Sequence, residues 1–248
     1  MAVSFVLLLA ATCVRSALSA QLPSYITPCS RSDPKLNECA LKNGNAAIPF
    51  LTKGDRAKGI PPLQPLHLEK VEVKQGAGAV AMDMTLTDVD VHHLGDMRIQ
   101  SISFDLENKA VNVSLKAPVV QVIGNYSIDG RVLLLPIKGN GGINITVEDM
   151  VCRYSTTFYT SKGGDGNEYI HFNNGILDTD TGHSHYYLGN LFNGDRTLGD
   201  NLNQFLKENW REVNQEIGPV VDEVINGLIH QLMDLIVKDV PYDSVFPK

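Results

Sequence analysis

The chain has 248 residues and a formal net charge of −7, with 28 acidic against 21 basic side chains. An acidic chain without basic clusters is a poor candidate for binding nucleic acid or an anionic membrane surface, so we expect neither partner. The length allows a sizeable core within one domain, and no linker composition divides the chain.

The N-terminal segment is typical of a secretory signal peptide. An apolar run over residues 2–14 is followed by small residues at Ser19 and Ala20. The run is too short to span a bilayer and the small residues provide a cleavage site, although no basic residue precedes the run. We therefore expect a signal peptide over residues 1–20 and a secreted, extracellular single domain over residues 21–248, without a membrane span.

Export decides how the cysteines are interpreted. After loss of the signal peptide the chain keeps Cys29, Cys39 and Cys152. The export route is oxidising, which favours a Cys29–Cys39 disulfide across a short N-terminal loop. In a strand, Cys152 lies on the same apolar face as Met150 and Tyr154, so a buried inert thiol is favoured over a reactive or intermolecular one.

The first predicted element after the signal peptide is a short helix. Asp33 and Pro34 are typical of a helix start, and residues 35–42 continue it. Pro49 and the proline-rich residues 54–65 end the helical region.

Residues 66–188 show the alternation of apolar and polar side chains that is typical of strands. The alternation changes phase several times, for example between Leu86 and Val89, and each change can be absorbed by a β-bulge. Glycine-rich residues 76–78, 139–142 and 163–166 are predicted hairpin turns. We expect an antiparallel sheet of long strands that curls strongly.

Three glycosylation sequons lie in this region, at Asn112, Asn125 and Asn144. Asn112 and Asn144 each lie between two β-branched apolar residues, so in a strand both asparagines point away from the apolar face. That outward placement suits glycosylation and agrees with export.

The C-terminal part has helical periodicity. Over residues 199–237 the apolar side chains recur every three or four positions, which predicts one long helix with a single apolar stripe. Pro219 is expected to kink it. A helix of this length needs a long partner, and a curled sheet wrapped along it would leave an elongated apolar tunnel wherever side chains do not fill the interior. The predicted fold class is therefore α+β.

A set of large apolar and aromatic side chains is the candidate lining of such a tunnel, although each of them would also suit an ordinary core. Methionine adapts to irregular guests, and Tyr126 or Tyr154 would offer a hydroxyl to a polar end of a ligand. The candidate residues are Met82, Met84, Phe104, Val122, Tyr126, Leu133, Leu135, Tyr154, Phe172, Phe205, Trp210, Val213 and Ile217.

Enzymatic interpretations find little support. Ser184 between His183 and His185 suggests a nucleophile with a base, but in a strand both histidines share one face while the serine lies on the other. The two histidines with Asp178 or Asp180 are a weak metal candidate, and two exposed histidines beside a turn explain them equally well. Glycine-elbow, phosphate-loop and zinc-protease motifs are missing from the sequence. We expect no catalytic residues, no metal and no cofactor.

Several longer motifs carry a family resemblance. They are LFNGDRTLGDNLNQFLKENW over residues 191–210, VPYDSVFPK over residues 240–248, GNYSIDGRVLLLPIKGNG over residues 124–141, and the proline-rich residues 59–66 after the Cys29 and Cys39 pair. In order and spacing the chain resembles the insect juvenile hormone binding protein/takeout family over nearly the whole of residues 21–248. The takeout branch looks closer, because the hormone carriers have a second bridge and Cys152 has no obvious partner.

The resemblance implies a curved antiparallel sheet around a long C-terminal helix, as in the wider tubular lipid-binding superfamily. It also implies a carrier of a small lipophilic ligand, such as a juvenile hormone-like terpenoid or a fatty acid, and we expect the protein to be a monomer, with a receptor as a further candidate partner. The alternative is an extracellular interaction protein that acts on a receptor with its tunnel filled by its own side chains. A large dry void would favour the carrier.

Overall fold

The computed structural model describes residues 21–75, 81–133 and 135–248. The predicted signal peptide over residues 1–20 and the predicted turn over residues 76–78 lie outside these residues. The elements are α1 (Leu36–Leu51), β1 (Leu66–Gln75), β2 (Ala81–His92), β3 (Arg98–Asp105), β4 (Ala110–Val132), β5 (Leu135–Lys162), β6 (Glu168–Phe172), β7 (Ile176–Asp180), β8 (His183–Leu188), α2 (Arg196–Glu208), α3 (Trp210–Val237) and α4 (Tyr242–Val245), with single 3-10 turns at Leu94–Asp96 and Phe192–Gly194.

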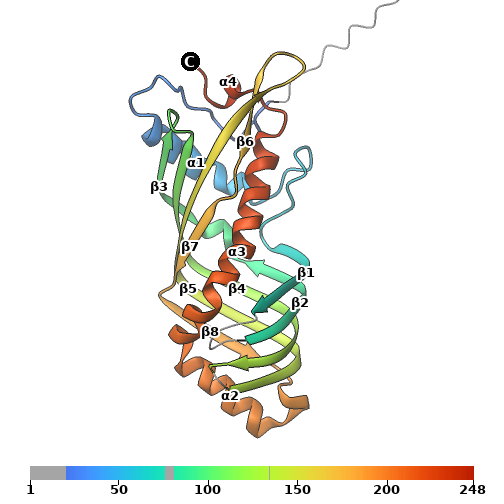
Figure 1. Ribbon diagram of the computed structural model, residues 1–248. Coiled ribbons are helices and arrows are strands. Elements are labelled where there is room, and N and C mark those ends of the chain that lie inside the picture. Colours follow the sequence, from blue (N-terminus) through green and yellow to red (C-terminus); the bar gives the residue numbers. More distant parts are fainter. Residues whose placement is uncertain (1–20, 76–80, 134) are drawn as a thin grey trace, which may run out of the picture.

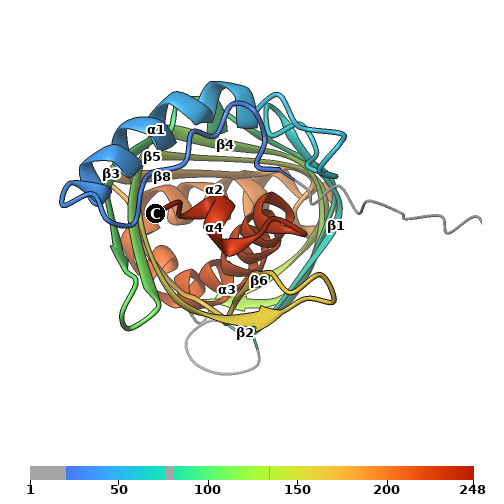
Figure 2. The same ribbon diagram turned by 90° about the horizontal axis from the view of Figure 1, so that it is seen from above.

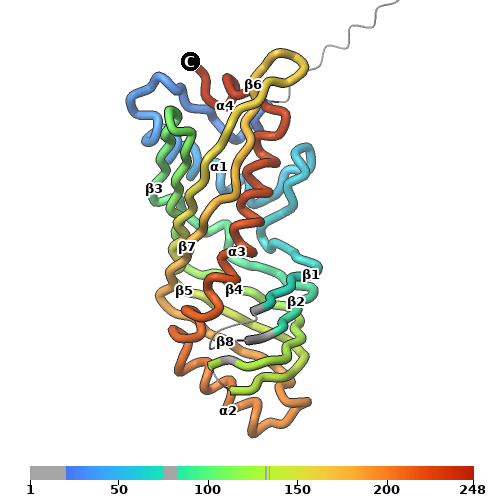
Figure 3. The backbone as a smooth tube through the Cα atoms, in the orientation of Figure 1, coloured from blue at the N-terminus to red at the C-terminus, as the bar shows by residue number. Residues whose placement is uncertain are grey.

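The strands form one antiparallel sheet built around a long hairpin. The order is β1-β2-β4-β5-β6, with β3 also paired to β4 and with β7 and β8 paired to β5. Strands β4 and β5 keep one register from Ala110 opposite Thr157 to Val132 opposite Leu135. Because this hairpin runs along most of the molecule, it is the frame on which the other strands assemble (Figure 3).

The phase changes in the sequence coincide with local irregularities of the sheet. The register of β2 and β4 shifts between Thr87 and Asp90, as the change after Leu86 predicts. In the β4–β5 ladder, Pro118 and Asp149 are the residues that leave a gap. Proline has no N–H to donate, and Asp149 has a positive φ of 49°. Since both strands are interrupted at the same level, their inward faces switch together and the register is kept.

The glycine-rich residues 139–142 are not a hairpin turn, as the sequence suggested, but part of β5. Glycine is needed there because another segment crosses the strand. A Cβ on Gly139 would lie 2.9 Å from the Tyr126 hydroxyl, and one on Gly141 would lie 2.6 Å from the carbonyl oxygen of Gly189. The glycines therefore mark a close backbone approach rather than a change of direction. The predicted turn at residues 163–166 is confirmed between β5 and β6.

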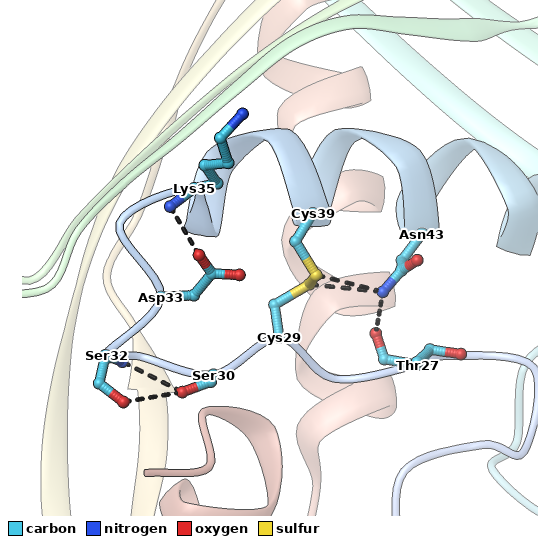
Figure 4. Close-up of a disulfide and its surroundings, with 8 residues drawn as sticks. All are labelled: Thr27, Cys29, Ser30, Ser32, Asp33, Lys35, Cys39 and Asn43. Carbon is cyan, nitrogen blue, oxygen red and sulfur yellow. Dashed lines mark hydrogen bonds between the residues drawn. A yellow bond between two sulfur atoms is a disulfide. The ribbon is translucent and has the colours of Figure 1, made fainter.

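Helix α1 is longer than predicted, because Pro49 lies inside its last turn and does not end the helix before it. The Asp33 carboxylate accepts a hydrogen bond from the backbone N–H of Lys35 at 2.8 Å, as a residue near the helix start is expected to do. The predicted Cys29–Cys39 disulfide is present and joins the segment before α1 to its second turn. Asn43 fixes the same corner by donating to the carbonyl of Thr27 at 3.0 Å (Figure 4).

The C-terminal helical region is two helices rather than the single helix predicted. α2 ends at Glu208 and α3 begins at Trp210. The break is at Asn209, whose φ of −112° and ψ of 30° are not helical. Its side-chain amide donates to the carbonyl of Phe205 at 2.8 Å, and such a local bond competes with continuation of the helix. Pro219, where a kink was expected, lies within α3.

Helix α3 runs along the length of the molecule and packs against the sheet, with α2 at one end and α4 at the other (Figure 1). Viewed along this axis, α3 and α4 lie on the inner side of the strands and α1 lies on the outer side (Figure 2). The predicted antiparallel sheet with a long C-terminal helix packed against it is confirmed. The strong curl is not confirmed, and within the described residues the sheet does not close into a barrel, since β1 and β6 are not paired.

Candidate ligand-binding site

The apolar side of α3 is incompletely covered along most of its length. Three clusters contact it in turn: one around Tyr126 near α2, one around Tyr154 in the middle, and one around Phe158 near α4. Within α3, however, every residue from 214 to 236 keeps some exposure, although many of these side chains are large and apolar. A helix that closely packs against a sheet buries one stripe fully, so the middle of α3 is covered less closely than its two ends, where Trp210, Val213 and Val237 are buried.

A cleft of about 890 Å³ opens between the second half of α3 and strands β5 and β6. A cavity of this size lies within the range that holds small-molecule ligands. At its edge the rings of Tyr159 and His171 stack with centroids 5.0 Å apart. The residues along the cleft are Tyr159, Ser161, Gly163, Tyr169, Ile170, His171, Phe172, His230, Gln231, Asp234, Leu235, Val237, Lys238 and Asp239.

The candidate lining residues do not gather at one place. The cluster near α2 takes six of them, of which Tyr126 and Val213 are buried: Met84, Tyr126, Leu133, Phe205, Val213 and Ile217. The cluster near α4 takes Phe104 and Phe172, and Phe172 also lines the cleft. Tyr154 belongs to the middle cluster.

Four candidates stand apart from these clusters. Val122 is half-buried, and Leu135 is 39% exposed. Trp210 is buried at the start of α3, where its ring meets the edge of His183 and the Arg211 guanidinium lies 4.4 Å from the ring centre. The side chain of Met82 lies outside the described part of the structure. The lining assignment therefore stays a prediction.

The two tyrosine candidates differ in what their hydroxyls do. Tyr126 is 3% exposed and donates a hydrogen bond to the carbonyl of Gly189 at 2.8 Å. Burial, helped by Tyr187, raises its pKa to about 12, so the hydroxyl stays protonated. Because this proton is already shared with the backbone, Tyr126 is poorly placed to offer it to a ligand.

The Tyr154 hydroxyl, by contrast, has no hydrogen-bond partner among the described residues although its atom is buried. The nearby Thr156 hydroxyl donates elsewhere, to the carbonyl of Asn173 at 2.8 Å. Burial raises the pKa of Tyr154; the Thr156 side chain lowers it through hydrogen bonding, although no bond of normal geometry joins the two groups, and the charge of Asp234 raises it. A buried polar group without a partner costs stability, so this hydroxyl is a candidate contact for a ligand.

Sequence reasoning missed the polar residues of α3 that face the cleft, above all His230 and Asp234. Their only signal is a spacing of four residues, which puts them on one side of a helix but matches no motif. The Tyr159 and His171 pair was also missed, because it depends on strand register: the two residues are directly opposite each other in β5 and β6.

The suspected catalytic and metal groups do not assemble. Ser184 is fully buried and its hydroxyl accepts from the Asn214 amide at 2.9 Å, while the exposed His185 lies on the other face of the strand. Within residues 21–75, 81–133 and 135–248, no group of three or more His, Cys, Asp or Glu is placed to hold a metal ion. In the same residues no helix is long and apolar enough to cross a membrane.

Cys152 is 5% exposed in the middle cluster and has a free thiol. Burial, together with the charge of Asp222, raises its pKa to about 11. A thiol that stays protonated and buried is chemically inert, in agreement with the prediction. The three sequon residues Asn112, Asn125 and Asn144 are all exposed.

Comparison with known proteins places this geometry in a family. "Circadian clock-controlled protein daywake" of Drosophila melanogaster is 24% identical over 233 residues, covering 91% of this chain and 88% of that protein. A Schistocerca gregaria protein provisionally named as beta-carotene-binding is 22% identical over 201 residues, covering 81% of this chain and 79% of its own.

The crystal structure of Takeout 1 from Epiphyas postvittana shares the fold, with a TM-score of 0.78 and 23% identity over 89% of this chain and 99% of that one. The model of the family described as haemolymph juvenile hormone binding protein matches residues 6–247. Because this match spans nearly the whole sequence, the chain belongs to the haemolymph juvenile hormone binding protein family, a family of binding proteins and not of enzymes.

Proposed function

We propose that the protein is an exported carrier that holds a small lipophilic ligand in an apolar tunnel between the sheet and α3. The observation that carries the proposal is the incomplete burial of α3 from residue 214 to residue 236. If no ligand bound here, each Å² of apolar surface left uncovered would lose about 25 cal/mol of hydrophobic stabilisation. A lipophilic guest recovers that burial.

The cleft supports the same proposal by offering a way in. It lies at the second half of α3, where Phe172 and Leu235 provide apolar walls and the Tyr159 and His171 rings stand at the edge. A terpenoid like juvenile hormone, a fatty acid or a similar chain would enter here and lie along α3. The provisional name of the Schistocerca gregaria relative refers to an apolar molecule, which agrees with a lipophilic guest.

The test is binding of the fluorescent apolar probe 1-N-phenylnaphthylamine to the purified protein, with competition by lipids. A matched pair of α3 variants locates the binding site. Val224 is half-buried on the apolar side, and its neighbour Glu223 is exposed. Val224→Trp should fill the tunnel and weaken probe binding at least tenfold, whereas Glu223→Trp should leave it unchanged.

Two results would count against a carrier. If neither the probe nor any lipid binds, and organic extracts of protein purified from its source contain no lipid by mass spectrometry, no guest exists. The receptor-directed interaction protein is then the better description, and its tunnel should prove to be filled by side chains.

Export has its own test. The exposed positions of Asn112, Asn125 and Asn144 suit glycosylation in the secretory pathway. Expression in insect cells should give protein in the medium that starts at residue 20 or 21 and loses mass on treatment with a glycan-removing amidase. Retention in the cytoplasm with an intact N-terminus would contradict export.

A further inference from the structure

We propose that Tyr154, Asn226 and His230 form a polar anchor beside the cleft that selects lipids with a hydroxyl group over esters and carboxylates. This inference rests on the proposed carrier function and names the chemical class of its ligand. Its basis is a group of buried polar atoms that the protein leaves without partners.

Four buried side-chain atoms lack a hydrogen-bond partner within the described residues: Lys58 Nζ, Tyr154 Oη, Asn226 Oδ1 and His230 Nδ1. Native proteins satisfy most such atoms, since each one left unpaired costs about 1–3 kcal/mol. The last three atoms belong to one neighbourhood, and this convergence is what points to a ligand.

Gly175 is the meeting point of the neighbourhood. The Asn226 amide donates to its carbonyl oxygen at 2.9 Å. From the other side the Tyr154 ring lies so close that a Cβ on Gly175 would be 2.5 Å from the hydroxyl oxygen. His230 follows Asn226 by one helical turn of α3, and it also lines the 890 Å³ cleft. Of the three residues only His230 lines the cleft, so a ligand would have to extend past it to reach Tyr154 and Asn226.

The hydrogen-bonding roles of the three atoms define the missing group. Because the Asn226 nitrogen donates to Gly175, its free Oδ1 can only accept. His230 Nε2 lies 3.4 Å from an Asp234 carboxylate oxygen, which favours the proton on Nε2 and leaves Nδ1 as an acceptor. Tyr154 Oη can donate. The matching group must both donate and accept, as an alcohol does.

Other polar ends fit less well. An ester or ketone only accepts, so it would leave the Asn226 and His230 atoms unsatisfied. A carboxylate also only accepts, and it would bring a negative charge near Asp222 and Asp234, whose charges act on Cys152 and Tyr154 respectively. A neutral long-chain or terpenoid alcohol donates its one proton to Asn226 Oδ1 or His230 Nδ1 and accepts from Tyr154 Oη, without adding charge.

The rival anchor is Lys58, whose ammonium would favour a carboxylate. Its neighbour Gly59 faces the Leu235 side chain, with a Cβ position 3.8 Å from it, so this loop also approaches the second half of α3. The two anchors predict opposite ligand preferences, and the same experiment separates them.

The experiment is displacement of 1-N-phenylnaphthylamine from the full protein by hexadecan-1-ol, methyl palmitate, palmitic acid and hexadecane. We expect hexadecan-1-ol to compete at about a tenfold lower concentration than methyl palmitate, the ratio typical of one or two extra hydrogen bonds. Tyr154→Phe and Asn226→Leu should each reduce this ratio to below about twofold, with hexadecane binding nearly unchanged.

Tyr25→Phe is the matched control, because its hydroxyl donates to Asp55 at 3.3 Å and is not part of the proposed anchor. It should keep the alcohol preference. Equal binding of all four lipids by the unmodified protein would overturn the anchor while the carrier function stands. A preference for palmitic acid that Lys58→Met removes would overturn it in favour of the lysine. Failure of every lipid to bind would remove the carrier function and the anchor together.

Discussion

The hydroxyl of Tyr126 donates a hydrogen bond to the carbonyl oxygen of Gly189 at 2.8 Å, which ties β4 to the segment that leads into α2. The bond passes over Gly139 of β5, whose missing side chain makes room for it. Tyr126 thus has a structural role at the α2 end of the molecule.

Removing this bond should destabilise the protein without changing its ligand preference. Tyr126→Phe keeps the ring and loses one buried hydrogen bond, which costs about 1 kcal/mol. In a chain of this size we expect the melting temperature to fall by about 2–4 °C. Differential scanning calorimetry measures the shift, and an unchanged melting temperature would show that the bond does not contribute.

Adding a methyl group beneath the bond should be more damaging. A Cβ on Gly139 would lie 2.9 Å from the Tyr126 hydroxyl and 3.0 Å from the Leu191 Cα, so the crossing segment must move. We expect Gly139→Ala to lower the free energy of unfolding by about 2 kcal/mol or more. Gly164→Ala is the control, because a Cβ there meets nothing within 4 Å. Similar denaturation midpoints for the two variants would contradict the close approach.

The buried thiol should make stability depend on alkaline pH. Folding raises the pKa of Cys152 from 9.0 to about 11, so the folded state holds this proton more tightly than the unfolded state does. The contribution is therefore complete below pH 9 and is lost as the pH rises towards 11. The free energy of unfolding, measured by guanidinium chloride denaturation, should decrease less between pH 8 and pH 10.5 for Cys152→Ala than for the unmodified protein.

A thiol reagent gives an independent check of the same burial. At pH 8 the Cys152 thiol of the native protein should react only as fast as the protein unfolds. In the denatured protein with its disulfide intact, one thiol per chain should react promptly. Fast reaction of the native protein would mean that Cys152 is accessible.

Loss of the disulfide should weaken the N-terminal region. Cys29 and Cys39 are separated by 10 residues, and closing a loop of this length is worth about 2–3 kcal/mol in the chain-entropy model. We expect the double variant Cys29→Ala and Cys39→Ala, which removes the bridge drawn in Figure 4, to unfold at a lower denaturant concentration, with lipid binding retained because neither cysteine lines the cleft. Loss of lipid binding at full folding would show that α1 takes part in the site.

The sequence predicted the local features of the sheet better than the ends of the helices. Alternation depends on which residues face the core, and the phase change after Leu86 therefore identified a real bulge. The break at Asn209 was missed because the apolar spacing continues across it, whereas its cause is a side-chain bond to Phe205. A kink was predicted at Pro219 because a proline can be recognised in a sequence, whereas the side-chain hydrogen bond that ends α2 at Asn209 cannot.

The candidate site shows the same limit. Tyr154 was predicted as a polar contact because a tyrosine on an apolar strand face is easy to recognise. Asn226 and His230 were missed, because their relevance depends on the loop at Gly175 reaching α3 from a distant part of the chain. Which polar atoms remain without partners is a property of the assembled structure, and the sequence pattern alone does not contain it.

The order of the elements has a consequence for synthesis. All eight strands precede α3 in the chain, yet α3 provides the side chains that cover the inner face of the sheet. The ribosome therefore makes the strands first, and the β4–β5 hairpin can form while the apolar inner face of the sheet is still exposed to solvent. Until the helix emerges, the nascent chain is a target for chaperones and for aggregation, and stalling translation just before Trp210 should trap it in this vulnerable form.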